Sequence, residues 1–383
     1  MNYYKLKQEH AAFKENALLG RYINFDHIAP LLKKHNNVVI TEIGRSVENR
    51  KIHSIELGTG PIKILAWSQM HGNESTSTKA LFDLLNFLGS EEEMADNILK
   101  KIKLLIIPML NPDGAQRYTR FNANEVDLNR DAQALTQPES TILKNIYTDF
   151  KPHFALNLHG QRTIFGVGEP PRSATVSLLS PAQDKERQIT PARERSMAVI
   201  CDINNMLQEF LPDAVGRYDD SFNINCVGDT LQYLNIPTIL FEAGHFPKDY
   251  EREQTRVFIF MALVRALETM GEIEEKLKFN AQDYFAIPEN KKCYYDYIIR
   301  NVTIPEQGSS DIAIQFEEKI DQNTLKFVPK IDKIGDLSAF RGHQEYDFKG
   351  RKPTQSLNFQ WKEGTILTHL AADNDQTITF SIN

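Results

Sequence analysis

The sequence predicts a layered α/β domain followed by a small β domain, and two features of the chain support this prediction. Up to about residue 280, short runs of continuous apolar residues alternate with segments whose apolar residues recur at helical spacing. From about residue 285, apolar and polar residues alternate instead, and turn-like clusters interrupt them. We therefore expect two domains, residues 1–280 and residues 285–383.

Four apolar runs of the first domain are expected to be buried strands, because strands covered on both faces carry apolar residues without alternation. They are IKILAWSQM (62–70), LLIIPML (104–110), FALNLHG (154–160) and IPTILFEAG (236–244). The segment TSTKALFDLLNFL has leucines at helical spacing, and Thr190-Pro191 supplies the cap residue and the proline that begin a second helix. These elements predict a sheet with helices on both faces. The stretch from Gly166 to Pro191 is expected to be a long surface loop.

The second domain is expected to be antiparallel, because its strand-like segments alternate apolar and polar residues. The segments are YYDYIIRNVTI, DIAIQFEE, TLKFVPKI, LNFQWKEG and QTITFSIN.

Composition excludes several classes of function. With 41% hydrophobic and 25% charged residues, the chain is typical of a soluble globular protein. A net charge of -7 argues against nucleic acid as a partner, and no apolar run is long enough to cross a membrane. The start, MNYYKLKQEH, lacks the apolar segment of a secretory signal. Three scattered cysteines, Cys201, Cys226 and Cys293, then predict free thiols in the cytoplasm.

A metal site is indicated at the ends of two predicted strands. His71 and Glu74 follow the strand 62–70, and a bend there lets both face one ion. A catalytic zinc ion commonly takes three protein ligands and leaves one position for water, so His159 is the natural third ligand. Taken alone, a histidine and an acid three residues apart are also common on surfaces.

Two further strand ends carry acidic residues. Glu242 follows five apolar residues, where burial raises the pKa of a carboxyl group and suits a general base. An acid at an exposed strand end is the simpler alternative. Asn111-Pro112-Asp113-Gly114 is expected to form a tight turn, with Asp113 as a hydrogen-bond partner of a ligand histidine.

Arginines supply the remaining candidate residues. Arg120 precedes the run Asp127-Leu128-Asn129-Arg130. A guanidinium group binds a carboxylate through two parallel hydrogen bonds and keeps its charge at any working pH. Two arginines near a metal ion would serve a substrate carboxylate and a developing oxyanion, whereas solvated arginines on a loop are the alternative.

Taken in order, these clusters resemble the zinc carboxypeptidases related to carboxypeptidases A, B and D, over about residues 20–270. The resemblance begins at IGRSVENRKI (43–52) and continues through HGNE, NPDG, DLNR, LHG and FEAG. It implies a three-layer α/β/α fold with a mixed, mostly parallel sheet, followed by the small, mainly β domain. Related enzymes of the carboxypeptidase D type carry a β-sandwich at that place.

The resemblance also implies a role for each residue of the site. His71, Glu74 and His159 match the ligands of one zinc ion per chain, and Glu242 matches the catalytic glutamate. Asn129 and Arg130 match the pair that binds the terminal carboxylate of the substrate. Arg120, which precedes Arg130 by ten positions, matches the arginine that polarises the scissile carbonyl. The expected lid tyrosine is absent at Ser221, and the nearest tyrosine is Tyr218.

The predicted function is therefore removal of C-terminal residues from peptides with a free carboxylate. Two other hydrolases of the same superfamily stay open: a deacylase of N-acyl amino acids and a carboxypeptidase of cell-wall peptides. A third alternative is an inactive binding module on a peptidase scaffold. The specificity position falls near Gly228, and the sequence does not identify the preferred residue.

Overall fold

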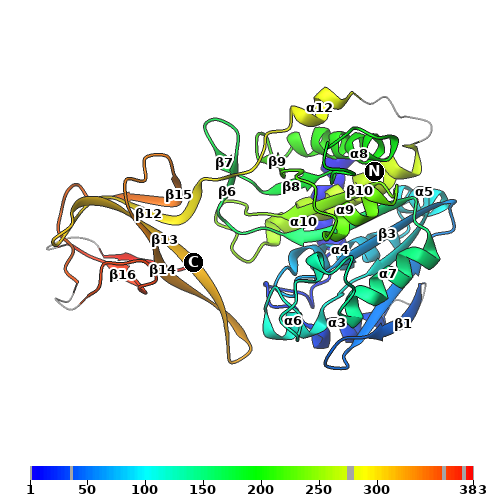
Figure 1. The fold of residues 1–383 in the computed structure, drawn as a ribbon, viewed down its shortest axis with the longest axis horizontal. Helices are drawn as coiled ribbons and strands as arrows, with labels where there is room; N and C mark the ends of the chain where they lie inside the picture. Colours follow the sequence, from blue (N-terminus) through cyan, green and yellow to red (C-terminus); the bar gives the residue numbers. More distant parts are fainter. Residues whose placement is uncertain (1, 35–37, 274–279, 356–358, 373–376, 383) are drawn as a thin grey trace.

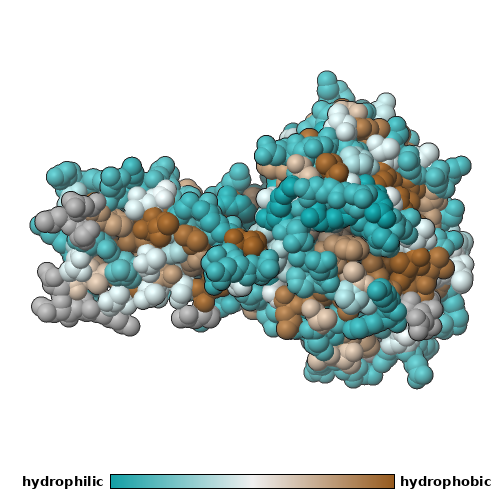
Figure 2. Space-filling model, turned by 90° about the horizontal axis from the view of Figure 1, so that it is seen from below, coloured by the Kyte–Doolittle hydropathy of each residue, from teal (hydrophilic) through white to brown (hydrophobic). Residues whose placement is uncertain are grey.

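A computed structural model shows an α/β body joined to an elongated, β-rich C-terminal part (Figure 1). The structure describes residues 2–34, 38–273, 280–355, 359–372 and 377–382. Viewed from below, the two parts meet at a narrow waist (Figure 2). No helix among these residues is long and apolar enough to span a membrane.

The α/β body is built on a mixed sheet of eight strands within the described residues, in the order β1-β2-β4-β3-β5-β10-β8-β9. The pairs β3/β4, β3/β5, β5/β10 and β8/β9 are parallel, and the other three are antiparallel. The strands are β1 (Val39–Arg45), β2 (Lys51–Leu57), β3 (Ile62–Ser68), β4 (Ile102–Ile107), β5 (Phe154–Gly160), β8 (Val176–Leu179), β9 (Val215–Arg217) and β10 (Thr238–Ala243). The predicted mixed, mostly parallel sheet is confirmed.

Helices cover both faces of this sheet, so its central strands are apolar on both sides. Ile64 and Ala66 of β3 pack toward α4 (Thr76–Leu88), α8 (Pro191–Gln208) and α10 (Glu253–Gly271). Their neighbours Leu65 and Trp67 pack toward α7 (Pro138–Phe150) and α9 (Val227–Tyr233). Because successive side chains of a strand point to opposite faces, a continuous apolar run is what a sheet between two helical layers requires.

Short helices complete the α/β body. They are α1 (Tyr3–Gln8), α2 (His10–Phe13), α3 (Phe25–Leu32), α5 (Glu93–Lys101), α6 (Pro112–Arg117), the 3₁₀ turn η1 (Leu128–Arg130) and α12 (Ala281–Phe285). The helix predicted at Thr190-Pro191 is confirmed, since the Thr190 side chain accepts a hydrogen bond from the Arg193 amide at the start of α8.

Two local predictions for this body are wrong. The stretch from Gly166 to Pro191 is not one surface loop: it contains part of β6 (Phe165–Val167), β7 (Arg172–Ser173) and the whole of β8. Strand β8 is buried because β10 and β9 pair with its two edges. The segment that begins at Asn111 is the start of α6, not a free turn, because the Asn111 side chain accepts from the Gly114 amide and caps the helix.

The C-terminal part contains a four-stranded sheet in the order β14-β13-β12-β15. Its strands are β12 (Tyr294–Ile304), β13 (Gly308–Asp321), β14 (Thr324–Gly335) and β15 (Arg341–Asp347). The expected antiparallel arrangement fails at one pair, because β15 returns to the far edge of the sheet and pairs parallel with β12. The preceding strand β11 (Lys291–Lys292) pairs with β6 of the α/β body.

Two expected C-terminal strands are largely missing from the described residues. In LNFQWKEG, residues 357 and 358 lie outside the described part, and residues 359–364 form no strand. The side chains of its aromatic residues Phe359 and Trp361 pack against the apolar core, and the Trp361 carbonyl accepts a hydrogen bond from Gln307 Nε2. In QTITFSIN only β17 (Ile378–Thr379) is a strand, paired with β16 (His369–Leu370).

Candidate metal centre and substrate cleft

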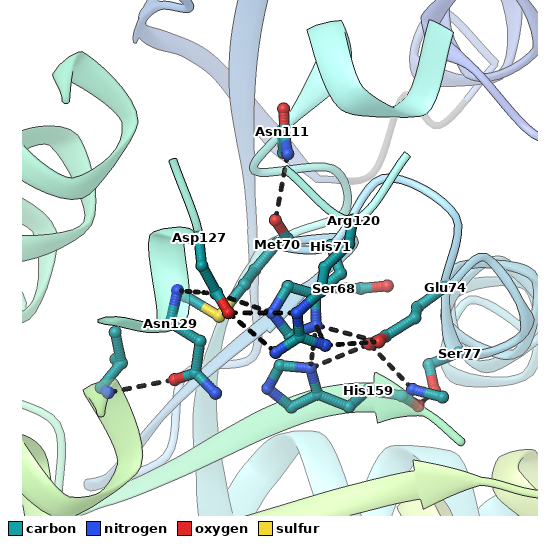
Figure 3. Close-up of polar contacts among 12 residues, drawn as sticks. Ser68, Met70, His71, Glu74, Ser77, Asn111, Arg120, Asp127, Asn129 and His159 are labelled. Atoms are coloured by element: carbon teal, nitrogen blue, oxygen red, sulfur yellow. Dashed lines mark hydrogen bonds and ion pairs between the residues drawn. The ribbon is translucent and has the colours of Figure 1, made fainter. Parts of the chain in front are cut away.

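The three predicted metal ligands converge at the edge of the large sheet where β3 and β5 end (Figure 3). His71 and Glu74 follow β3, and His159 lies on β5, which runs parallel to β3. One ligand atom from each of the three residues lies within 4.8 Å of the others. Parallel strands bring their carboxyl ends to the same edge, which is where such sheets place their sites.

The geometry of these donor atoms fits a tetrahedral zinc ion. The two Glu74 oxygens lie 2.9 Å from His71 Nδ1 and from His159 Nδ1, and the two Nδ1 atoms are 3.1 Å apart. Two imidazole nitrogens directed at each other need either a proton or a cation between them. Tetrahedral zinc with bonds of about 2.0–2.1 Å separates its ligand atoms by roughly 3.3 Å. The residues therefore suit zinc.

Asp127 fixes the orientation of His71. Its Oδ1 lies 3.1 Å from His71 Nε2, so Nε2 carries the proton and Nδ1 keeps its lone pair for a metal ion. The prediction that Asp113 plays this part is wrong. Asp113 instead accepts hydrogen bonds from the Ser46 hydroxyl at 2.8 Å and the Glu48 amide at 2.9 Å, because it closes the loop between β1 and β2.

Neighbouring groups shift the pKa values of all three ligand residues. Burial raises the pKa of Glu74, but the adjacent His71 and His159 outweigh it and hold that pKa below its usual range, which favours the carboxylate. Burial lowers the pKa of His159, which favours its neutral ring. Burial also acts against the charged form of His71, yet Glu74 and Asp127 raise its pKa overall. The raised pKa favours a proton on His71, which a bound metal ion would displace.

Glu242 lies beside this centre on β10, directly opposite His159 in the parallel register. Its Oε2 is buried and accepts no hydrogen bond from the described residues. Burial, and then the Glu74 carboxylate, raise the pKa of Glu242 well above its ordinary value. An unpaired carboxylate with a high proton affinity, next to a metal site, is suited to take a proton from water.

Arg120 borders the metal centre from the other side. Its Nε and Nη2 donate to Asp127 Oδ2 at 3.0 and 2.9 Å, and its Nη1 lies 3.6 Å from Glu74 Oε1. Two parallel hydrogen bonds to one carboxylate oxygen hold the guanidinium plane in place. The side chain is 40% exposed and faces the cleft, where it can donate to an oxyanion.

Asn129 and Arg130 line the same cleft. Asn129 Oδ1 accepts from the Val227 amide at 3.1 Å, which leaves its side-chain NH₂ for a ligand. Arg130 is exposed and donates to the Asn129 carbonyl at 2.8 Å. No carboxylate of the described residues forms an ion pair with Arg130, so this cation is available to an anionic ligand.

Tyr218, from the segment after β9, also lines the cleft. Its ring lies 5.4 Å from that of Phe165, and its hydroxyl is hydrogen-bonded to Asn290. Burial and the Glu242 carboxylate raise the pKa of Tyr218. Asp229 lies nearby, where burial raises its pKa to about 6.

The structure therefore brings all the predicted site residues to one cleft of about 760 Å³. Their individual roles stay predictions. The sequence patterns did not identify Asp127 as the partner of His71, although Asp127 stands at the head of the DLNR run.

Comparisons with known proteins agree with this geometry. Residues 27–165 match a family model described as zinc carboxypeptidase. The chain is 30% identical over 129 residues to "Probable carboxypeptidase 2" of Arthroderma benhamiae, covering 33% of this chain and 23% of that protein. It is 21% identical over 406 residues to "Carboxypeptidase D" of Mus musculus, covering 87% of this chain and 28% of that protein. The chain thus spans about a quarter of the length of these relatives.

Solved structures share the fold. A metallo-carboxypeptidase from Burkholderia cenocepacia aligns with a TM-score of 0.53 and 16% identity, covering 66% of this chain and 70% of that one. A metallo-carboxypeptidase from Pseudomonas aeruginosa, in complex with (2-guanidinoethylmercapto)succinic acid, aligns with a TM-score of 0.51 and 17% identity, covering 65% and 70%. The resemblance of this chain to the zinc carboxypeptidase family is confirmed, and its α/β body has the metallo-carboxypeptidase fold.

Proposed function

We propose that this protein is a zinc-dependent carboxypeptidase that removes C-terminal residues from peptides. The observation that carries the proposal is the convergence of three features in one cleft: a His-Glu-His ligand set, the unpaired carboxylate of Glu242 and the unpaired guanidinium of Arg130. The first two suit hydrolysis with an activated water, and the third suits a substrate that ends in a carboxylate.

His71, Glu74 and His159 would hold one zinc ion. Zinc at that place supplies a Lewis acid that polarises a carbonyl group and lowers the pKa of a coordinated water. Glu242 accepts a proton from the attacking water at its carboxylate and delivers it to the leaving amine. Arg120, held by Asp127, donates to the carbonyl oxygen as negative charge develops there.

Asn129 and Arg130 determine which bond is cut. Arg130 pairs with the terminal carboxylate of the substrate, and the free NH₂ of Asn129 donates to it. Tyr218, at the rim of the cleft, packs over the bound residue. This arrangement restricts cleavage to the bond next to the C-terminus.

The lining of the cleft also bears on the three alternative functions. A deacylase of N-acyl amino acids and a carboxypeptidase of cell-wall peptides use the same centre and differ only in the remainder of the substrate. An inactive binding module is disfavoured, because every position that hydrolysis needs is occupied by a suitable side chain. The cytoplasmic location stays a prediction.

The proposal is tested by comparing a peptide with its C-terminal amide. The amide lacks the charge that Arg130 would bind, and losing this charge-assisted pair at an exposed arginine costs roughly 10- to 100-fold in kcat/KM. We expect the free peptide to be cleaved, the amide to resist, and Arg130→Ala to abolish most of this preference. Arg117→Ala is the matched control, because Arg117 pairs with Glu48 and does not line the cleft. Equal rates on the peptide and its amide would refute the carboxypeptidase assignment.

A further inference from the structure

The C-terminal sheet contributes one wall of the cleft. Gln315 and Glu317 of β13 and Lys330 and Asp332 of β14 line the same cleft as the metal ligands. Gln315 and Lys330 face each other in the antiparallel register, and Glu317 is two residues along from Gln315. Because side chains alternate along a strand, these three share one face of the hairpin. We call Gln315, Glu317, Lys330 and Asp332 the hairpin wall.

The hairpin wall is held in place by buried contacts with the α/β body. Glu318, its neighbour on β13, accepts from Arg21 Nη1 at 2.5 Å and from the Tyr118 hydroxyl at 2.7 Å. Gln315 Nε2 donates to Thr163 Oγ1 at 2.7 Å. Figure 1 shows this hairpin, in orange, as a long element of the C-terminal part. Through these contacts with Arg21, Tyr118 and Thr163, the hairpin wall is attached to the α/β body and forms one side of the cleft.

The anchors also indicate which part of a substrate meets the wall. The Arg21 carbonyl accepts a hydrogen bond from the Ser75 hydroxyl, and Ser75 is next to the ligand Glu74. Thr163 lies just after the end of β5, the strand that carries the ligand His159. Arg130, by contrast, is next to Asn129, whose Oδ1 accepts a hydrogen bond from the Val227 amide at the start of α9. A peptide with its carboxylate at Arg130 and its scissile carbonyl at the metal centre extends its remaining residues toward the hairpin wall.

We propose that the hairpin wall binds the residues on the N-terminal side of the scissile bond, and that the substrates are oligopeptides rather than N-acyl amino acids. This inference rests on the proposed function and names its substrate class. The cleft of about 760 Å³ is in the upper part of the range for small-ligand sites, which is more than a single acylated residue fills. Within the wall Lys330 Nζ pairs with Glu317 Oε2 at 2.6 Å, and Gln315 Nε2 donates to Thr163 and Asp296. The Gln315 Oε1 atom accepts no hydrogen bond from the described residues, so this carbonyl, the Glu317–Lys330 pair and the Asp332 carboxylate suit the polar backbone and amino end of a peptide.

The test compares two substrates that share the same C-terminal dipeptide, an N-acetyl dipeptide and an N-acetyl hexapeptide. The measured quantity is the ratio of their kcat/KM values. We expect the hexapeptide to be preferred at least tenfold. Glu317→Gln and Lys330→Gln are each expected to lower the ratio by about tenfold, the effect of losing one charge-assisted hydrogen bond. Lys326→Gln is the matched control, because Lys326 is exposed on the same strand and does not line the cleft.

The outcomes separate this inference from the proposed function. If both substrates are hydrolysed but the wall variants leave the ratio at its parental value, the wall does not bind substrate and only this inference is overturned. Equal losses on both substrates overturn it as well, because they indicate a structural effect. Circular dichroism of each variant identifies misfolding. Where a variant is misfolded, Asp332→Asn replaces it in the same comparison of kcat/KM ratios. If neither substrate is hydrolysed, the proposed function fails and this inference fails with it.

Discussion

His343 lies where the C-terminal sheet contacts the α/β body. Its titration predicts that the free energy of unfolding falls at low pH. Its Nε2 donates to the Thr163 carbonyl at 2.8 Å, and its ring stacks on Tyr294 at 4.6 Å. The buried His245 ring lies 4.4 Å from the His343 ring, and Arg252 is the nearby charged group. Burial is the main cause that lowers the pKa of His343 from 6.5 to about 4; the hydrogen bond to the Thr163 carbonyl opposes this decrease, and Arg252 contributes to it.

The sign and size of the effect follow from this pKa. Between pH 6.5 and pH 4 the unfolded chain binds a proton at His343 that the folded protein does not bind. The free energy of unfolding therefore falls as the pH drops through this window and is unaffected above it. A pKa change from 6.5 to about 4 corresponds to at most about 3.4 kcal/mol. Because the ring keeps some solvent contact, we expect about 2 kcal/mol.

His343→Gln isolates this contribution, since glutamine can still donate to the Thr163 carbonyl but does not titrate. Urea unfolding followed by circular dichroism at pH 7, 6, 5 and 4 gives the free energy for each protein. The parent should lose about 2 kcal/mol more than the variant between pH 7 and pH 4. His369→Gln, at an exposed histidine of β16, should follow the parent. Parallel curves for the parent and His343→Gln would refute the reasoning.

Three predictions concern the metal centre and Glu242 beside it. His159→Ala removes one of the three donors, so elemental analysis should find far less than the one zinc per chain of the parent, and full occupancy would exclude His159 as a ligand. Glu242→Gln should keep the zinc and lose at least about a hundredfold in kcat, since Gln cannot accept a proton; a loss within tenfold would point to another base. In the zinc-free protein, the same change should raise the free energy of unfolding increasingly as the pH rises above 4.5. The reason is that burial raises the pKa of Glu242 and penalises its charged form. Equal free energies of unfolding for the parent and the variant at pH 8 would contradict this explanation.

The sequence by itself determined the central strands and the residues at their ends. In the run FALNL (154–158) every residue except Asn157 is apolar, because the strand is covered on both faces. The polar residues that follow such runs, His71 after β3 and Glu242 at the end of β10, fall at one edge because these strands are parallel. The candidate metal ligands could therefore be chosen from local patterns and their order.

Only the tertiary structure decided which distant segments meet. Strand β8 is short and looked like a loop, and its burial depends on β10 and β9 lying on either side. Asp127, rather than Asp113, orients His71 because the segment from Arg120 to Asp127 brings Asp127 to the His71 ring, where Arg120 also pairs with it. The hairpin wall and the parallel β12/β15 pair depend on how the C-terminal sheet docks at Arg21 and Thr163. Such contacts join residues tens to hundreds of positions apart. No local periodicity records them, because periodicity reports only which face of an element is covered and not what covers it.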